Sequence, residues 1–131
     1  MTKNFKYRFR IYYEDTDSGG VVYYANYLKY LERARSEAIY SLGLTNTKLQ
    51  KDYGTLIIVK SCNIEYKKPA RFEDELEIIS SVSTKTKTSF TMKQIIKKDE
   101  ETISEADVQL VTVNKEGKPV KIPEILQKFL N

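Results

Sequence analysis

Apolar and cationic residues alternate along the first part of the chain. The apolar members are Phe5, Tyr7, Phe9, Ile11 and Tyr13, and the residues between them include Lys6, Arg8 and Arg10. A period of two predicts a strand with one buried face and one wetted, cationic face. The glycines at 19 and 20 end this pattern, because glycine adopts backbone angles that other residues avoid.

The spacing of apolar residues becomes helical between about positions 22 and 42. One stripe along this segment is formed by Tyr27, Leu31, Ala34, Ala38 and Leu42. Gly43 follows directly, in the position typical of a glycine that ends a helix. We therefore predict one long helix at 22–42 and, after it, a loop at 45–54.

Four strand-like segments occupy the second half of the chain. We predict them at Leu56–Tyr66, Glu75–Val82, Ser89–Lys97 and Ile103–Val113. Their short connections favour antiparallel neighbours, and Pro123–Leu130 is predicted as a short closing helix. One strand, one long helix and four strands together predict an α+β fold in which the helix packs on a curved sheet.

Two details of these strands bear on the core. Ile58, Cys62 and Ile64 share one parity, so we expect Cys62 to be a buried core residue. In the last strand the apolar parity changes at residues 111–113, which predicts a β-bulge there.

The composition limits the chemistry. The chain has 131 residues, which fits one domain spanning 1–131, and 22 Lys+Arg against 18 Asp+Glu give a formal charge of +4. It has no histidine and one cysteine, which excludes histidine-dependent catalytic triads and a zinc cluster, so we expect neither a metal nor another cofactor. Without a long basic run or a binding motif, this charge does not favour nucleic acid.

The sequence also bears on localisation. It has no apolar run long enough to span a membrane and no signal-peptide core. Since a lone cysteine also suits a reducing compartment, we expect a cytoplasmic protein.

Two long stretches carry a family resemblance. Residues 12–27, YYEDTDSGGVVYYANY, followed by ERAR at 32–35, are similar to the hot-dog-fold acyl-CoA thioesterases, in particular the YbgC-type enzymes associated with the Tol-Pal system, with the 4-hydroxybenzoyl-CoA thioesterases as wider relatives. NIEYKKPARFED at 63–74 matches too, and the resemblance covers essentially the whole chain. It implies a long central helix wrapped by a five-stranded antiparallel sheet. It also implies edge-to-edge pairing into homodimers or homotetramers, with active sites at the dimer interface.

The resemblance further implies hydrolysis of a short- or medium-chain acyl-CoA to free acid and coenzyme A. The family's catalytic carboxylate is the second aspartate of Asp-x-Asp-x-x-Gly, which corresponds to Asp17. In this family it would act as nucleophile or general base. The local sequence alone instead favours a turn or capping aspartate. The first N–H groups of a helix lack internal partners, so those around Tyr23 and Tyr24 are candidates for an oxyanion hole, and the resemblance places the polarising amide at Tyr24. The expected substrate-binding residues of this turn are Gly19, Gly20, Val21 and Tyr23.

The other residues near the motif allow more than one interpretation. Asp15 is expected to be structural, bonding turn amides, and a direct role is the lesser alternative. Tyr13 is either catalytic, as in YbgC-type enzymes, or a core residue that continues the apolar face of the first strand. Tyr24 stands where YbgC-type enzymes usually carry histidine, and because a phenol with a pKa of ~10 is a poor base, we expect it to shape the acyl pocket or orient water. The cations considered for the nucleotide of coenzyme A, each also readable as a surface charge, are Lys60, Arg71, Lys85 and Lys87.

Two functional alternatives stay open beside the enzyme. One is a non-catalytic module that binds acyl-CoA or acyl carrier protein. The other is a scaffold for acyl carrier protein or phospholipid-synthesis enzymes, peripheral to the inner membrane. Acyl chain length, the carrier, the exact role of Asp17 and the choice between dimer and tetramer are open at this point.

Overall fold

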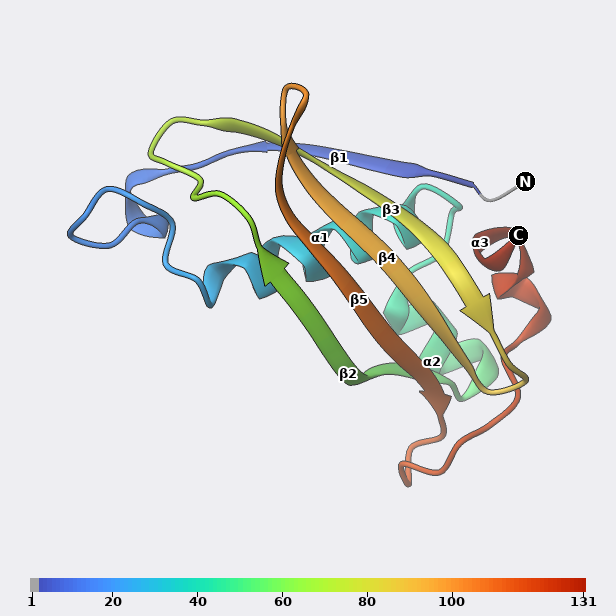
Figure 1. Ribbon diagram of the computed structural model, residues 1–131. Coiled ribbons are helices and arrows are strands. Elements are labelled where there is room, and N and C mark those ends of the chain that lie inside the picture. The colour runs from blue at the N-terminus through green and yellow to red at the C-terminus, as the bar shows by residue number, and fades with distance from the viewer. Residues whose placement is uncertain (1–2) are drawn as a thin grey trace.

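A computed structural model describes residues 3–131 and confirms the α+β architecture (Figure 1). In chain order its elements are β1 (Phe5–Arg10), the 3-10 turn η1 (Tyr13–Asp15), α1 (Asn26–Tyr40), α2 (Asn46–Tyr53), β2 (Leu56–Tyr66), β3 (Glu75–Lys85), β4 (Ser89–Lys98), β5 (Glu101–Val113), η2 (Glu124–Leu126) and α3 (Gln127–Leu130). The five predicted strands are present, and the long helix crosses one face of their sheet.

All pairings in the sheet are antiparallel, in the order β1-β3-β4-β5-β2. The expectation that all four later strands follow one another as neighbours is wrong for β2. The chain after Tyr66 crosses the end of the sheet, so β3 joins β4 and β1, while β2 pairs with β5 and forms an edge (Figure 1).

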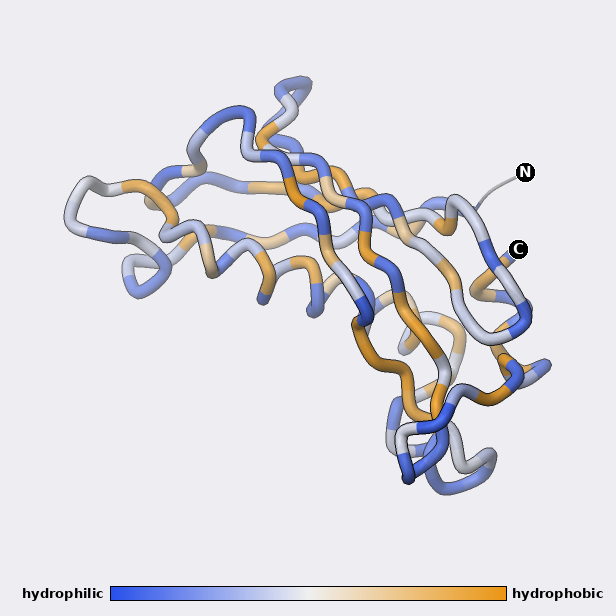
Figure 2. The backbone as a smooth tube through the Cα atoms, turned by 60° about the horizontal axis from the view of Figure 1, so that its bottom comes forward, coloured by the Kyte–Doolittle hydropathy of each residue, from blue (hydrophilic) through white to orange (hydrophobic). Residues whose placement is uncertain are grey.

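The core lies between α1 and the sheet face that it covers. Along β3, β4 and β5 buried residues alternate with more exposed ones, as the hydropathy colouring of the strands also shows (Figure 2). The helix contributes Tyr27, Tyr30, Leu31, Ala34 and Ala38, each at most 3% exposed. The predicted stripe is thereby confirmed except for Leu42, which is half-buried beyond the end of the helix.

The ends of the helical region differ from the prediction. The helix begins at Asn26 rather than near 22, because Val21 and Val22 make β-bridges to other segments. The predicted loop at 45–54 is mostly the helix α2, whose N-terminus is capped by the Thr45 hydroxyl and whose C-terminus is closed by Gly54 in the left-handed region.

The predicted bulge at residues 111–113 is wrong. In β5 every second residue from Ser104 to Thr112 is buried, and the hydroxyl of Thr112 lies 2.7 Å from the carbonyl of Val120. The sheet has register shifts at other places: β5 has an extra residue at Ile103 opposite β4, β3 and β4 shift between Val82 and Thr84, and β2 shifts between Val59 and Ser61, which places its extra residue at Lys60. Because opposed residues of antiparallel strands share a face, Ile57 and Val59 face α1 before the bulge and Cys62, Ile64 and Tyr66 after it.

Cys62 is exposed, so its expected place in the core is wrong. Its side chain faces the helix layer, but β2 is an edge strand and α1 packs mainly over β1 and β3. The helix therefore leaves much of the inner face of β2 exposed, although Ile57 and Ile64 pack against the edge of the core.

Candidate active site

Asp17 lies at the surface in a tight turn between η1 and α1. Its amide donates to the carbonyl of Val21 at 2.9 Å, and its own carbonyl accepts from Gly20 at 3.0 Å. Its carboxylate atom Oδ1 accepts from the amide of Gly19 at 2.8 Å. Gly20 has φ of +78°, which glycine adopts at low cost, and a Cβ on Gly19 would lie 3.3 Å from Oδ1. The turn thus fixes one carboxylate oxygen and leaves the other at an exposed surface.

The second matching stretch lies directly beside this turn. Val22 donates to the carbonyl of Ala70 at 2.8 Å, and Val21 forms a β-bridge with Arg71. The amide of Ala70 in turn donates to the hydroxyl of the buried Tyr27 at 3.1 Å. Segments about 50 residues apart in sequence are therefore held together, and Arg71 is brought to the glycine turn.

The amides before α1 are not equivalent. The N–H of Tyr23 donates to the carbonyl of Asp15 at 3.1 Å, so its predicted role in an oxyanion hole is wrong. Within residues 3–131, no acceptor takes a hydrogen bond from the N–H of Tyr24 or Ala25. These two donors precede the first turn of the helix, where the dipole is positive, so they can meet a developing negative charge.

Asp15 has the structural geometry that the sequence suggested. Its Oδ2 accepts from the amide of Tyr12 at 2.8 Å, and its carbonyl also accepts from the side-chain amide of Asn26 at 2.9 Å. Burial, and then the nearby Asp15 carboxylate, raise the pKa of Tyr30. Asp15 therefore ties the motif to the helix and the core instead of facing solvent.

The two predicted tyrosines both lie on the surface. Tyr13 is 79% exposed, so the alternative that it packs in the core is wrong. The reason is that β1 ends at Arg10 and the chain turns before Tyr13. The ring of Tyr13 instead packs edge-on with that of Phe72, with ring centroids 5.8 Å apart. Tyr24 is 62% exposed, and its carbonyl accepts from the hydroxyl of Tyr66 at 3.2 Å. Sequence reasoning gave no role to Phe72 and Tyr66, although one lies inside the second matching stretch and the other inside the β2 pattern.

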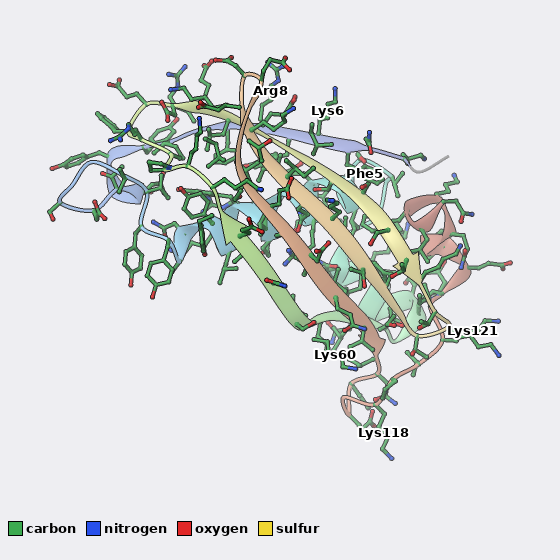
Figure 3. The ribbon with its side chains drawn as sticks, viewed as in Figure 1. Phe5, Lys6, Arg8, Lys60, Lys118 and Lys121 are labelled. Carbon is green, nitrogen blue, oxygen red and sulfur yellow. The ribbon has the colours of Figure 1, made fainter. Side chains whose placement is uncertain are left out.

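The candidate cations are not brought together. Arg71 lies at the glycine turn, whereas Lys60 is at the bulge of β2, away from that turn (Figure 3). Lys85 bonds the side chain of Asn131 at 2.8 Å near the C-terminus. Of the expected substrate-binding residues, the structure groups Gly19, Gly20, Val21 and Arg71, and it separates Lys60 from them.

Two further features of residues 3–131 concern ions and membranes. They include no group of three or more Cys, Asp or Glu side chains arranged to hold a metal ion. The same part of the chain has no helix that is long and apolar enough to cross a membrane.

Comparison with known proteins identifies the family. The model of a family described as the thioesterase superfamily matches residues 19–105. The acyl-CoA thioester hydrolase YbgC of Escherichia coli O6:H1 is 37% identical over 131 residues, which cover 98% of this chain and 94% of that protein. The acyl-CoA thioesterase YbgC of Haemophilus influenzae is 34% identical over 125 residues, covering 95% and 92%. The crystal structure of a probable thioesterase from Bartonella henselae matches with a TM-score of 0.85 at 33% identity, covering 94% of this chain and all of that one. The chain therefore belongs to the thioesterase superfamily and has its hot-dog fold.

Proposed function

We propose that this protein hydrolyses acyl-CoA thioesters at the Asp17–Tyr24 turn. The observation that carries the proposal lies on one short segment, where an exposed carboxylate accompanies the amides of Tyr24 and Ala25, which donate to no acceptor within residues 3–131. The names of the relatives from E. coli and H. influenzae support acyl-CoA as the substrate class. The substrate supplies its own coenzyme A, and the proposal needs no further cofactor.

The proposed mechanism follows from where negative charge develops during hydrolysis of the thioester. Attack on the thioester carbonyl places negative charge on its oxygen, and the Tyr24 amide is the donor that would stabilise it; losing one such donor typically costs about a hundred- to a thousandfold in rate. Asp17 either takes a proton from the attacking water or attacks the carbonyl itself, giving an anhydride that water then cleaves. In both routes the C–S bond breaks, a C–O bond to a water oxygen forms, and the thiolate leaves.

Tyr24 does not need to replace a histidine in this scheme. Its backbone amide supplies the polarising donor, and its exposed ring lies beside Tyr66, where it can border the acyl group. A thiolate is a good leaving group, so no general acid is required of the phenol. Arg71, next to Val21, is the cation that the structure favours for the nucleotide end of the substrate.

We also propose that two protomers pair through β2. This edge strand has eleven residues, with Ile58 and Val59 each almost half exposed in the single chain. Pairing would cover the exposed part of the inner face of β2 beside α1. Acyl carrier protein as an alternative carrier and a cytoplasmic location, which a lone cysteine suits, belong to the same proposal.

The direct test compares Asp17→Asn with Glu14→Gln, an exposed carboxylate of the same loop. Hydrolysis of a C4–C12 acyl-CoA panel is followed by loss of thioester absorbance, because the exposed Cys62 would consume disulfide reagents. We expect Asp17→Asn to lose at least a hundredfold in kcat with unchanged unfolding temperature, and Glu14→Gln to retain activity. Full activity in Asp17→Asn would overturn the site, and tight binding without turnover in the unaltered protein would indicate a binding module instead.

A further inference from the structure

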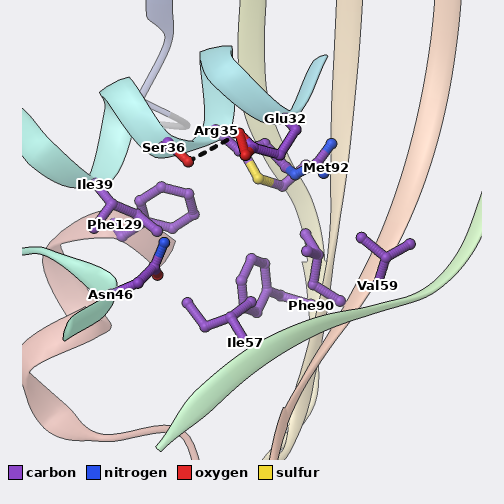
Figure 4. A pocket seen from close by; sticks show the side chains of 11 residues that line it. Glu32, Arg35, Ser36, Ile39, Asn46, Ile57, Val59, Phe90, Met92 and Phe129 are labelled. Carbon is purple, nitrogen blue, oxygen red and sulfur yellow. Dashed lines mark hydrogen bonds between the residues drawn. The ribbon is translucent and has the colours of Figure 1, made fainter. Parts of the chain in front are cut away.

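A pocket lies between α1 and the partly exposed inner face of β2. Its volume is about 210 Å³, and its apolar floor includes Val59, Phe90 and Met92, while Glu32 and Arg35 line it from the helix (Figure 4). The inward residues of β2 lead from this pocket along the strand to Tyr66, which bonds the carbonyl of Tyr24. The pocket is therefore connected along one strand to the proposed reaction centre.

Arg35 is unusual among the residues that line this pocket, because its guanidinium forms no ion pair within residues 3–131. Its Nη1 donates to Oε1 of Gln94 at 2.9 Å, and no carboxylate among residues 3–131 comes within 4 Å of its guanidinium. Glu32 lies near but accepts from the Ser36 hydroxyl at 3.1 Å instead. A guanidinium has five N–H donors, so most of those on Arg35 have no acceptor within residues 3–131, and burial lowers the pKa of this side chain.

Gln94 fixes the orientation of the Arg35 guanidinium from inside the core. Gln94 is fully buried, and its Nε2 donates to the carbonyl of Leu31 at 3.0 Å and to the Ser80 hydroxyl at 2.9 Å. These bonds define which end of the Gln94 amide faces Arg35. A half-buried cation that is held in one place keeps its spare donors available, and a ligand oxygen that displaces water can accept from them.

We propose that Arg35 is a specificity-determining residue that binds an oxygen atom on the tail of the acyl group. The inference rests on the proposed hydrolysis and adds the substrate class: acyl groups with a hydroxyl or carboxylate oxygen remote from the thioester. Eleven residues separate Tyr24 from Arg35, or about 16 Å along a helix, and helical side chains lean back toward the N-terminus. The arginine side chain itself reaches back by roughly 6 Å, which leaves about 10 Å for an extended acyl chain of roughly eight carbons.

The test compares octanoyl-CoA with its 8-hydroxy and 8-carboxylate counterparts, together with the C6 and C10 series. We expect the oxygenated substrate of the fitting length to be preferred, and Arg35→Met to reduce the ratio of kcat/KM between oxygenated and plain substrate by about tenfold to a hundredfold. The hydroxyl and carboxylate series distinguish the two oxygen sources. Arg33→Met, an exposed arginine of the same helix, is the matched control and should leave the ratio unchanged.

A binding measurement separates this inference from the proposed function. Calorimetry on Asp17→Asn, with and without Arg35→Met, measures recognition of the same ligands without turnover. If the unaltered protein hydrolyses none of the panel, the proposed function fails, and the calorimetric ratio alone decides the role of Arg35. An unchanged ratio after Arg35→Met overturns the inference. So does an equal loss for all ligands accompanied by a change in oligomeric mass, because Arg35 would then join protomers.

Discussion

Replacing each of the two adjacent glycines of the Asp17 turn by alanine should affect a different property, stability for Gly20 and activity for Gly19. Gly20 has φ of +78° and open space where a Cβ would lie, so its cost is backbone strain alone. A left-handed non-glycine residue costs about 1–2 kcal/mol, which lowers the unfolding temperature by roughly 4–7 °C in a chain of this size. Gly19 is outside the left-handed region, but its Cβ would press on Oδ1 of Asp17 at 3.3 Å.

For Gly19→Ala we therefore expect little loss of stability and a loss of activity. The exposed Asp17 carboxylate can yield by a few tenths of an ångström, and since a 1 Å misplacement can cost about a hundredfold, we expect kcat/KM to fall about three- to tenfold. Calorimetric unfolding and acyl-CoA hydrolysis are measured on both variants. Equal destabilisation by Gly19→Ala and Gly20→Ala would refute the reasoning, as would a Gly20→Ala variant as stable as the unaltered protein.

Two further predictions concern polar side chains that are buried or partly buried. Gln94→Leu should lower the free energy of unfolding by about 1–3 kcal/mol in urea titrations, because Arg35 and the Ser80 hydroxyl lose their partner; an unchanged midpoint would mean that water replaces the amide. Burial is the main factor that raises the pKa values of Tyr27, Tyr30 and Tyr66, so the folded protein holds these protons more tightly than the unfolded chain, and stability should fall as the pH rises above about 10. Ultraviolet titration should show these three of the ten tyrosines ionising late, and simultaneous ionisation of all ten in folded protein would contradict this.

Periodicity predicts most of this fold because each pattern reports which face is buried. The stripe of α1 and the alternation in β3 to β5 are accurate, since these elements have a core on one side. The edge strand β2 was misread because apolar parity alone does not show that a bulge at Lys60 changes the face. For α2, a polar segment without an apolar stripe gave no periodic signal, although Thr45 and Gly54 are its capping residues.

The candidate site is less accessible to such reasoning. The motif located Asp17 and the free amide of Tyr24, but the bond from Tyr23 to Asp15 depends on how the turn folds back on itself. Likewise, the adjacency of Val21 and Arg71 arises from tertiary pairing across about 50 residues. Arg35 gave no sequence signal beyond the family motif, because its single hydrogen bond within residues 3–131, to Gln94, depends on the tertiary fold.

The two edges of the sheet explain which one can take a second copy. β1 has only six residues and presents Lys6, Arg8 and Arg10 between its apolar positions, and such short, cationic edges resist pairing. β2 is nearly twice as long and places apolar side chains on both of its faces, while α1 leaves much of its inner face exposed. The bulge at Lys60 twists this edge locally, so a partner strand must match it in register. An edge that is long, apolar and specific in register suits a defined pairing of two chains better than indiscriminate association, and such a pairing would close the groove that holds Arg35.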